Sequence, residues 1–100
     1  DLMTPLIEKL QPRALVKIKA NLNPKTEKII EHSFHRDLDY SDSYTAVYYV
    51  NSNDGYTLFK DGTKIESIEN RIVIFRSNQT HTGTTCTNQK ARVVINFNYF

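Results

Sequence analysis

Residues 44–59 read YTAVYYVNSNDGYTLF, two apolar runs separated by a turn, and this stretch indicates the class of fold. Residues 44–51 are rich in β-branched and aromatic side chains, which favours a largely buried strand. Residues 51–55 have the composition of a tight turn, and residues 55–59 are expected to return as the hairpin partner of the first run. The stretch therefore predicts antiparallel β structure.

Short strands and turns continue on both sides of this stretch. Residues 15–22 alternate with a period of two, apolar at Val16, Ile18, Ala20 and Leu22 and polar between them, which predicts a half-buried strand. Asp61-Gly62 is a second hairpin signal. Further strand patterns lie within residues 63–68, 70–75, 80–84 and 91–100. With at most one short helix, at residues 4–10, this series predicts an antiparallel sandwich or barrel.

Composition limits the classes of protein to which the chain can belong. One hundred residues make a single domain, and the net charge of +2, with acids and bases interspersed, gives no reason to propose a nucleic-acid partner, although it does not exclude one. The single cysteine, Cys86, rules out an internal disulfide and suits a reducing compartment. No apolar run approaches the roughly 20 residues of a membrane span. We therefore expect a cytoplasmic protein, in the host cytoplasm if it is viral.

The two ends of the chain suggest a longer parent protein. The sequence does not begin with Met, and it stops inside an apolar strand pattern. We expect residues 1–100 to be one core domain, the C-terminal portion of a longer protein whose upstream elements are missing.

The residues that carry chemistry begin with His35-Arg36-Asp37. In an extended segment, side chains at i and i+2 share a face, so His35 and Asp37 can hold one metal ion while Arg36 points away. His81 comes from a distant strand. Two imidazoles and one carboxylate are the ligand set of the facial triad of non-haem Fe(II) oxygenases. His-x-Asp alone is a weak signal, and the distal histidine and a following arginine strengthen it.

That arginine is Arg92, in the apolar final strand, eleven residues after His81 and expected to lie roughly one hairpin away from it. A guanidinium directed inward needs an anion, and its planar fork suits a carboxylate. Tyr48 and Tyr49 must face opposite sides of their strand, and whichever faces the metal could donate its hydroxyl to a bound carboxylate. Thr57 could do the same.

Other interpretations of these residues remain open. His35 and Asp37 could be an exposed pair beside a loop, and His81 could be a loop residue. His32 competes as an imidazole but has Phe34, not an acid, two residues on. Asp39 could replace Asp37 only if the strand pairing shifted. We expect Cys86 to have a passive role.

The order of these motifs resembles that of a known family. The motifs are FHRD at 34–37, YTAVYYVN at 44–51, DGYTLF at 54–59, NRIVIF at 70–75, HTG at 81–83 and RVVIN at 92–96. Over residues 14–100 the chain is similar to the Fe(II)/2-oxoglutarate-dependent dioxygenases of the prolyl 4-hydroxylase-like branch, particularly its small phage-type members. Several prolyl hydroxylases have Lys where Arg92 stands.

The resemblance implies an all-β double-stranded β-helix, or jelly roll. It implies Fe(II) held by the catalytic triad His35, Asp37 and His81, with 2-oxoglutarate as co-substrate and ascorbate as a further candidate cofactor. It also implies that Arg92 pairs with the distal carboxylate of 2-oxoglutarate, assisted by Tyr49, and we add Thr57 to this group.

The function that follows is hydroxylation of a peptidyl substrate, prolyl groups included, or of a small molecule, with O₂ consumed and succinate and CO₂ released. Two other classes remain: a catalytically degenerate jelly-roll module with a binding or structural role, and a cupin-like metalloenzyme of another kind. The latter is disfavoured because such sites use more histidines than this chain offers.

Overall fold

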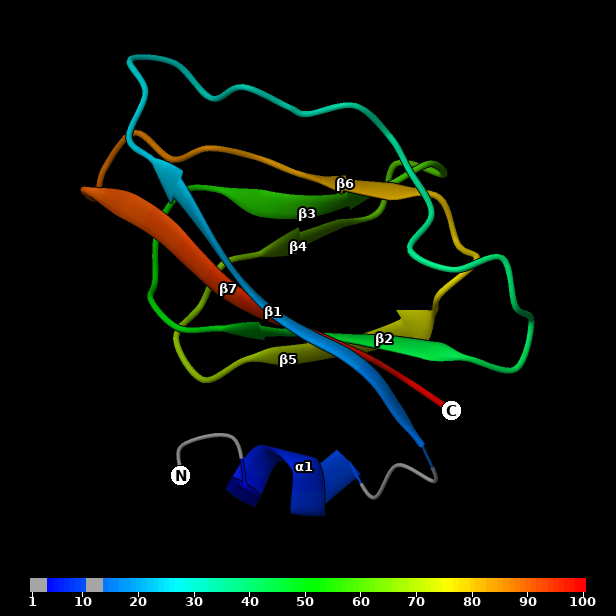
Figure 1. The fold of residues 1–100 in the computed structure, drawn as a ribbon. Helices are drawn as coiled ribbons and strands as arrows, with labels where there is room; N and C mark the ends of the chain where they lie inside the picture. The colour runs from blue at the N-terminus through cyan, green and yellow to red at the C-terminus, as the bar shows by residue number, and fades with distance from the viewer. Residues whose placement is uncertain (1–3, 11–13) are drawn as a thin grey trace.

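The computed structural model describes residues 4–10 and 14–100, which form one short helix and seven strands (Figure 1). In chain order these are α1 (Thr4–Leu10), β1 (Leu15–Pro24), β2 (Tyr44–Tyr49), β3 (Tyr56–Phe59), β4 (Lys64–Glu66), β5 (Ile72–Arg76), β6 (His81–Gly83) and β7 (Ala91–Tyr99). The strands form two antiparallel sheets, a four-stranded one in the order β1-β7-β2-β5 and a three-stranded one in the order β4-β3-β6. Figure 1 shows the sheets facing each other, with α1 outside the four-stranded sheet.

The connections between the strands make this sandwich a jelly roll. Glu31 bridges Thr84 and His35 bridges His81, so residues 31–35 extend the three-stranded sheet beyond β6. When this segment is included, the chain passes from one sheet to the other at every connection from β1 onward except β3–β4. The prediction of an all-β jelly roll with a short N-terminal helix is confirmed.

One of the two predicted hairpins forms and the other does not. β3 pairs with β4 through the turn that contains Gly62, whose φ of 96° suits glycine. The predicted pairing of β2 with β3 is wrong, because β2 pairs with β5 and β7 instead. The Asn51 side chain bonds the Ala91 carbonyl oxygen and the Val93 amide, which ties this corner to β7. An apolar run, a turn and a second apolar run describe a corner between sheets as well as they describe a hairpin.

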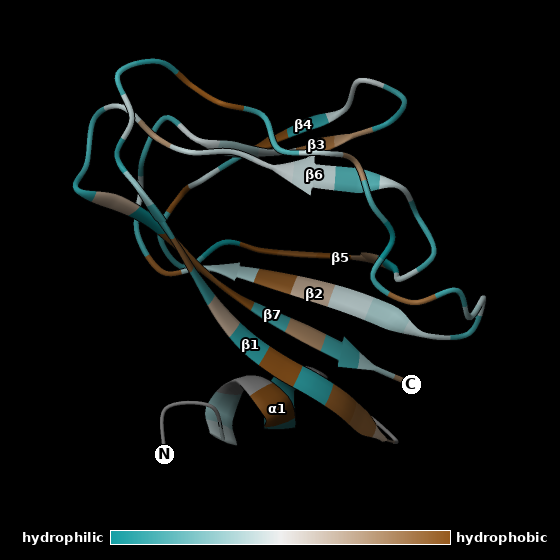
Figure 2. Cartoon of the chain, turned by 45° about the horizontal axis from the view of Figure 1, so that its top comes forward, coloured by the Kyte–Doolittle hydropathy of each residue, from teal (hydrophilic) through white to brown (hydrophobic). Residues whose placement is uncertain are grey.

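The prediction of a half-buried strand at β1 is also wrong, because most of its residues are exposed. Its alternation is real and appears in Figure 2 as brown and teal bands, but Val16 is 49% exposed and Leu22 is 65% exposed. Ile18 pairs with Phe97, which packs on the outer face of the sheet, whereas Lys19 pairs with Asn96 and turns to the space between the sheets. The polar side of this edge strand therefore faces inward.

The apolar core has two parts. Between the sheets, Val47, Tyr49, Phe59, Phe75 and Val94 pack together. On the outer face of the four-stranded sheet, Ala46, Phe97 and Tyr99 pack with Ile7 of α1 beside them. The inner cluster does not fill the space between the sheets, and the remaining part is where the polar residues of the site gather.

Candidate metal centre

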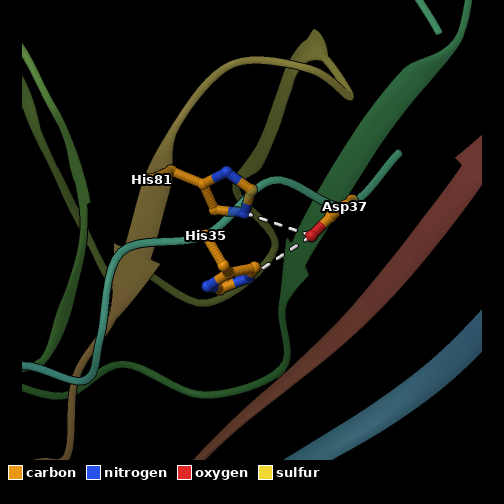
Figure 3. Close-up of side chains that lie close together, drawn as sticks. All are labelled: His35, Asp37 and His81. Atoms are coloured by element: carbon orange, nitrogen blue, oxygen red, sulfur yellow. Dashed lines mark ion pairs between the residues drawn. The ribbon is translucent and has the colours of Figure 1, made fainter. Parts of the chain in front are cut away.

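Three side chains that the sequence nominates as metal ligands lie together beside the space between the sheets: His35, Asp37 and His81 (Figure 3). His35 and His81 exchange two backbone hydrogen bonds of 2.9 Å, so their ring centroids lie 4.6 Å apart. Asp37 Oδ1 lies 3.4 Å from the Nε2 atom of each histidine. The three ligand atoms lie within 4.8 Å of one another, close enough to share one ion.

The donor chemistry of this cluster fits a metal ion. His81 Nδ1 lies 2.8 Å from the Gln79 carbonyl oxygen, and because a carbonyl only accepts, Nδ1 carries the hydrogen. The Nε2 lone pair of neutral His81 then faces Asp37 Oδ1 at 3.4 Å. Two acceptors so placed need a proton or a cation between them. Metal-binding histidines also commonly donate a hydrogen bond from the ring nitrogen that does not bind the metal to a backbone carbonyl.

Asp37 is held in place by two polar side chains of the four-stranded sheet. The Thr45 hydroxyl donates to Asp37 Oδ2 at 2.8 Å, and the Asn98 amide donates to the same oxygen at 3.1 Å. Thr45 and Asn98 are direct partners across β2 and β7. Because these bonds engage Oδ2, Oδ1 is left to the histidines.

The charges of the cluster stabilise one another. Burial raises the pKa of Asp37, but hydrogen bonds from His81 and Thr45 and the charge of His81 outweigh it, and the pKa lies at about 2. Burial lowers the pKa of His81, but the hydrogen bond and the charge of Asp37, together with the Gln79 carbonyl, bring it above its ordinary value. In the metal-free protein His81 therefore binds a proton more readily than an ordinary histidine, and a metal ion must displace that proton.

Arg92 lies at the start of β7 and is buried, with 2% of its surface exposed. Its Nε donates to Ser67 Oγ at 3.1 Å and its Nη2 donates to Thr57 Oγ1 at 3.3 Å. Within the described residues, no carboxylate forms an ion pair with Arg92. Burial accordingly lowers the pKa of Arg92. Its guanidinium also lies over the ring of Tyr49, 5.8 Å from the centroid. A buried cation whose only partners are hydroxyls and an aromatic ring is an unusual and costly arrangement.

Two glycines make room for this guanidinium. A Cβ on Gly83 would lie 3.2 Å from Arg92 Nη1. A Cβ on Gly55 would lie 2.5 Å from Arg92 Cδ and 2.6 Å from the Thr85 carbonyl oxygen, closer than real contacts allow. The absence of side chains at Gly55 and Gly83 therefore leaves room for the Arg92 side chain, which indicates a fixed position for its guanidinium.

Of the two neighbouring tyrosines, Tyr49 is the one that faces the interior. It is fully buried, and its hydroxyl lies 2.7 Å from Thr57 Oγ1. Burial raises the pKa of Tyr49, so its hydroxyl keeps its proton near neutral pH. Tyr48 points outward, where its hydroxyl bonds Asn70.

A cavity of about 250 Å³ is lined by residues of both the metal cluster and the Arg92 site. Its lining includes His35, His81, Thr57, Arg92, Val47 and Val94. The expectation that His81 and Arg92 lie one hairpin apart is wrong, because β6 and β7 belong to different sheets. The two residues line the same cavity from opposite sheets.

The structure leaves the other candidate ligands outside the cluster. His32 Nε2 bonds Asn23 Oδ1 at 3.2 Å. Asp39 is exposed and pairs with Arg36 at 3.8 Å. Cys86 is buried, with its Sγ 3.5 Å from the Gln89 carbonyl oxygen.

Sequence reasoning missed the residues that support the cluster. Thr45, Asn98 and Ser67 are polar, buried and engaged with Asp37 or Arg92. The available signal was a polar residue at an inward position of a strand whose outward positions are apolar, as Asn98 is in β7. That signal requires knowing which face is inward.

Within the residues that the structure describes, no helix is both long and apolar enough to cross a membrane.

Comparison with known proteins gives a fold and no closer relationship. No family model matches the chain, and no curated protein matches it in sequence. A cupin protein from Bacteroides fragilis superposes with a TM-score of 0.64 at 9% identity, over 94% of this chain and 72% of the other. The protein NMB1881 from Neisseria meningitidis gives 0.58 at 11%, over 90% and 83%.

A Pseudomonas putida prolyl-4-hydroxylase is also similar, with a TM-score of 0.55 at 18% identity. The match covers 99% of this chain and 60% of that one. At such identities the likeness concerns the fold alone. The chain has a cupin-like jelly-roll fold with a His-Asp-His group that could hold a metal ion.

Proposed function

We propose that this protein is an Fe(II)- and 2-oxoglutarate-dependent dioxygenase of the prolyl 4-hydroxylase-like branch. The observation that carries the proposal is one cavity lined both by the two histidines of the His-Asp-His cluster and by a buried arginine without a carboxylate partner. A ligand that chelates a metal at one end and carries a carboxylate at the other satisfies both groups. A 2-oxo diacid has this form.

His35, Asp37 and His81 would hold the metal. Two nitrogen ligands and one oxygen ligand suit Fe(II) and leave positions for a chelating co-substrate and O₂. When bound, Fe(II) with 2-oxoglutarate and O₂ supplies the oxidising power for hydroxylation, with succinate and CO₂ as by-products. The protein contributes ligation and orientation, and Asp37 is fixed for this by Thr45 and Asn98.

Arg92 would bind the distal carboxylate of the co-substrate. Arg–carboxylate pairs are commonly bidentate and short, and burial strengthens them because water does not compete. Thr57, bonded to both Arg92 and Tyr49, can present its hydroxyl to the same carboxylate. Val47 and Val94 provide apolar walls that exclude water between the two ends.

The likeness to a prolyl-4-hydroxylase supports the branch assignment but does not identify the substrate. A peptidyl prolyl group or a small molecule is the class we propose. Ascorbate as a cofactor, a phage origin, the cytoplasmic location and membership of a longer parent chain stay predictions.

The test is optical. Fe(II) is added to the protein without oxygen, followed by 2-oxoglutarate, and the visible charge-transfer band of the chelate is recorded. The proposal expects a band in the wild type and none with Asp37→Ala. In Arg92→Gln the band should appear only at much higher 2-oxoglutarate concentrations. Iron binding without a band at any concentration would favour the alternative, a catalytically degenerate jelly-roll module with a binding or structural role.

A further inference from the structure

We propose that the substrate is an extended acidic peptide, held in a groove beside the metal cluster by the inward-facing lysines of β1. This inference rests on the proposed function, since it assigns the substrate class of the same site. The groove has a volume of about 420 Å³ and runs between β1 and residues 35–38. It reaches the cluster directly, because His35 and Asp37 are part of its wall.

The charge of the groove is the first argument. Lys17 and Lys19 line it, and as i and i+2 residues of one strand they lie on the same face, about 7 Å apart. Neither forms an ion pair with a described residue. Arg36 lies on the opposite wall.

The carboxylates nearby do not neutralise these cations. Asp37 belongs to the metal cluster, where its Oδ2 is already bonded to Thr45 and Asn98. Asp39 is exposed and contacts Arg36 only at 3.8 Å. The groove therefore presents a net positive surface next to the proposed reaction centre, and a substrate with carboxylates at alternate positions matches the spacing of the lysines.

Hydrogen-bonding groups indicate a peptide. Asn96 lines both the groove and the cavity, and its Oδ1 is buried without a partner in the described part of the chain. An unpaired buried acceptor calls for an N–H donor, which a peptide has and a simple polyanion lacks. Because β1 is an edge strand that pairs only with β7 in the described residues, a second extended chain can lie along it.

The groove is poorly suited to nucleic acid, the other common polyanion. Single-stranded nucleic acids bind through aromatic side chains on which bases stack. The described residues that line the groove include no phenylalanine or tyrosine. The observations therefore favour an acidic peptide.

The experiment measures peptide binding separately from co-substrate binding. A fluorescein-labelled peptide of alternating glutamate and proline is titrated with the full chain, without oxygen and with Fe(II) and 2-oxoglutarate present, and anisotropy is recorded. A second peptide has glutamine in place of every glutamate, and an oligothymidylate of similar length serves as the nucleic-acid probe. The charge-transfer band, measured on the same samples, reports the proposed function by itself.

The variants compare lysines inside and outside the groove. The double variant Lys17→Gln/Lys19→Gln should bind the acidic peptide about fivefold more weakly. The matched control, Lys28→Gln/Lys90→Gln, removes the same charge from exposed positions outside the groove and should bind normally.

The inference is overturned if the glutamine peptide binds as well as the acidic one, if both double variants lose affinity equally, or if oligothymidylate binds more tightly. A band without selective peptide binding refutes only this inference. Selective peptide binding without a band refutes the proposed function and leaves an acidic-peptide binding module.

Discussion

The two ends of the cavity handle buried charge in opposite ways. At the metal end, Asp37 lies within 3.4 Å of two histidines and accepts hydrogen bonds from Thr45 and Asn98. At the other end, Arg92 is more deeply buried, donates hydrogen bonds only to hydroxyls and lies over the Tyr49 ring. One end satisfies its charges within the protein, and the other leaves a cation that only a ligand can neutralise.

This difference indicates how the two ends respond to ligands. A metal ion must displace a proton from a pair that is already favourable, so its binding depends on pH. An anion at Arg92 removes an existing penalty, so its binding should stabilise the fold strongly. The predictions below separate the two ends, beginning with the largest effect.

Removing the Asp37 carboxylate should cause the largest loss of metal binding. Asp37→Ala deletes one of three ligands, and we expect metal affinity to fall on the order of 1000-fold. Titration with Fe(II) or Mn²⁺ followed by calorimetry measures the loss. Asp39→Ala is the matched control because Asp39 is exposed and outside the cluster, and it should bind metal normally. Equal metal affinity in wild type and Asp37→Ala would exclude the cluster as the metal site.

Removing the Arg92 guanidinium should weaken the binding of 2-oxoglutarate without lowering the stability of the fold. Arg92→Met keeps much of the volume and deletes the unpaired cation, so 2-oxoglutarate affinity should fall by about 3 kcal/mol, roughly 100-fold. The Tm of the ligand-free protein should stay level or rise, since a buried charge without a counter-charge is unfavourable. Calorimetric titration and thermal unfolding give both values, with the exposed Arg71→Met as control. A marked loss of Tm in Arg92→Met alone would mean that Arg92 is a structural residue.

Much of the metal cluster could be predicted from the sequence, because the spacing of its residues and the order of the strands determine which side chains meet. His35 and Asp37 are two residues apart, and the bridge between His35 and His81 brings the distal histidine to them. The jelly roll itself follows from the number of short strands and their turns. The roles of these residues as ligands stay predictions.

The errors share one physical cause. Alternation along a strand states which residues share a face, but only the partner strands decide which face is inward. In β1 the usual assumption, apolar inward, fails because Lys19 faces a polar cavity. The β2–β3 hairpin fails for a related reason, since the bonds of Asn51 to β7, distant in sequence, decide that corner.

Removing one of the two side chains that hold Asp37 should lower the metal affinity by an intermediate amount. Asn98→Leu removes the amide that donates to Oδ2 and keeps a similar volume, and metal affinity should fall about 10- to 100-fold. The affinity for 2-oxoglutarate of the protein saturated with metal should hardly change, because Asn98 is not part of the lining of the cavity that contains Arg92. A variant that binds metal like the wild type would show that Thr45 alone suffices to fix the carboxylate.

The smallest effect is the pH dependence of the metal-free protein, which we expect to come from the metal end alone. The Asp37 pKa is lowered, so its contribution to stability is full above the unfolded value near 3.8 and is lost as pH falls toward 2. The His81 pKa is raised, so its contribution is full below about 6.5 and is lost as pH rises through the raised value. The Tm of the metal-free protein should therefore fall by a few degrees between pH 6 and pH 8.

Metal should reverse that slope. A bound ion needs the neutral imidazole, so higher pH favours binding and should raise the Tm of the metal-saturated protein over the same interval. His81→Gln should flatten both profiles, whereas His32→Gln, which alters a histidine outside the cluster, should keep them. Parallel slopes with and without metal would mean that proton and metal do not compete for His81 Nε2. The arginine end should contribute nothing to either slope, because its guanidinium stays charged throughout this range.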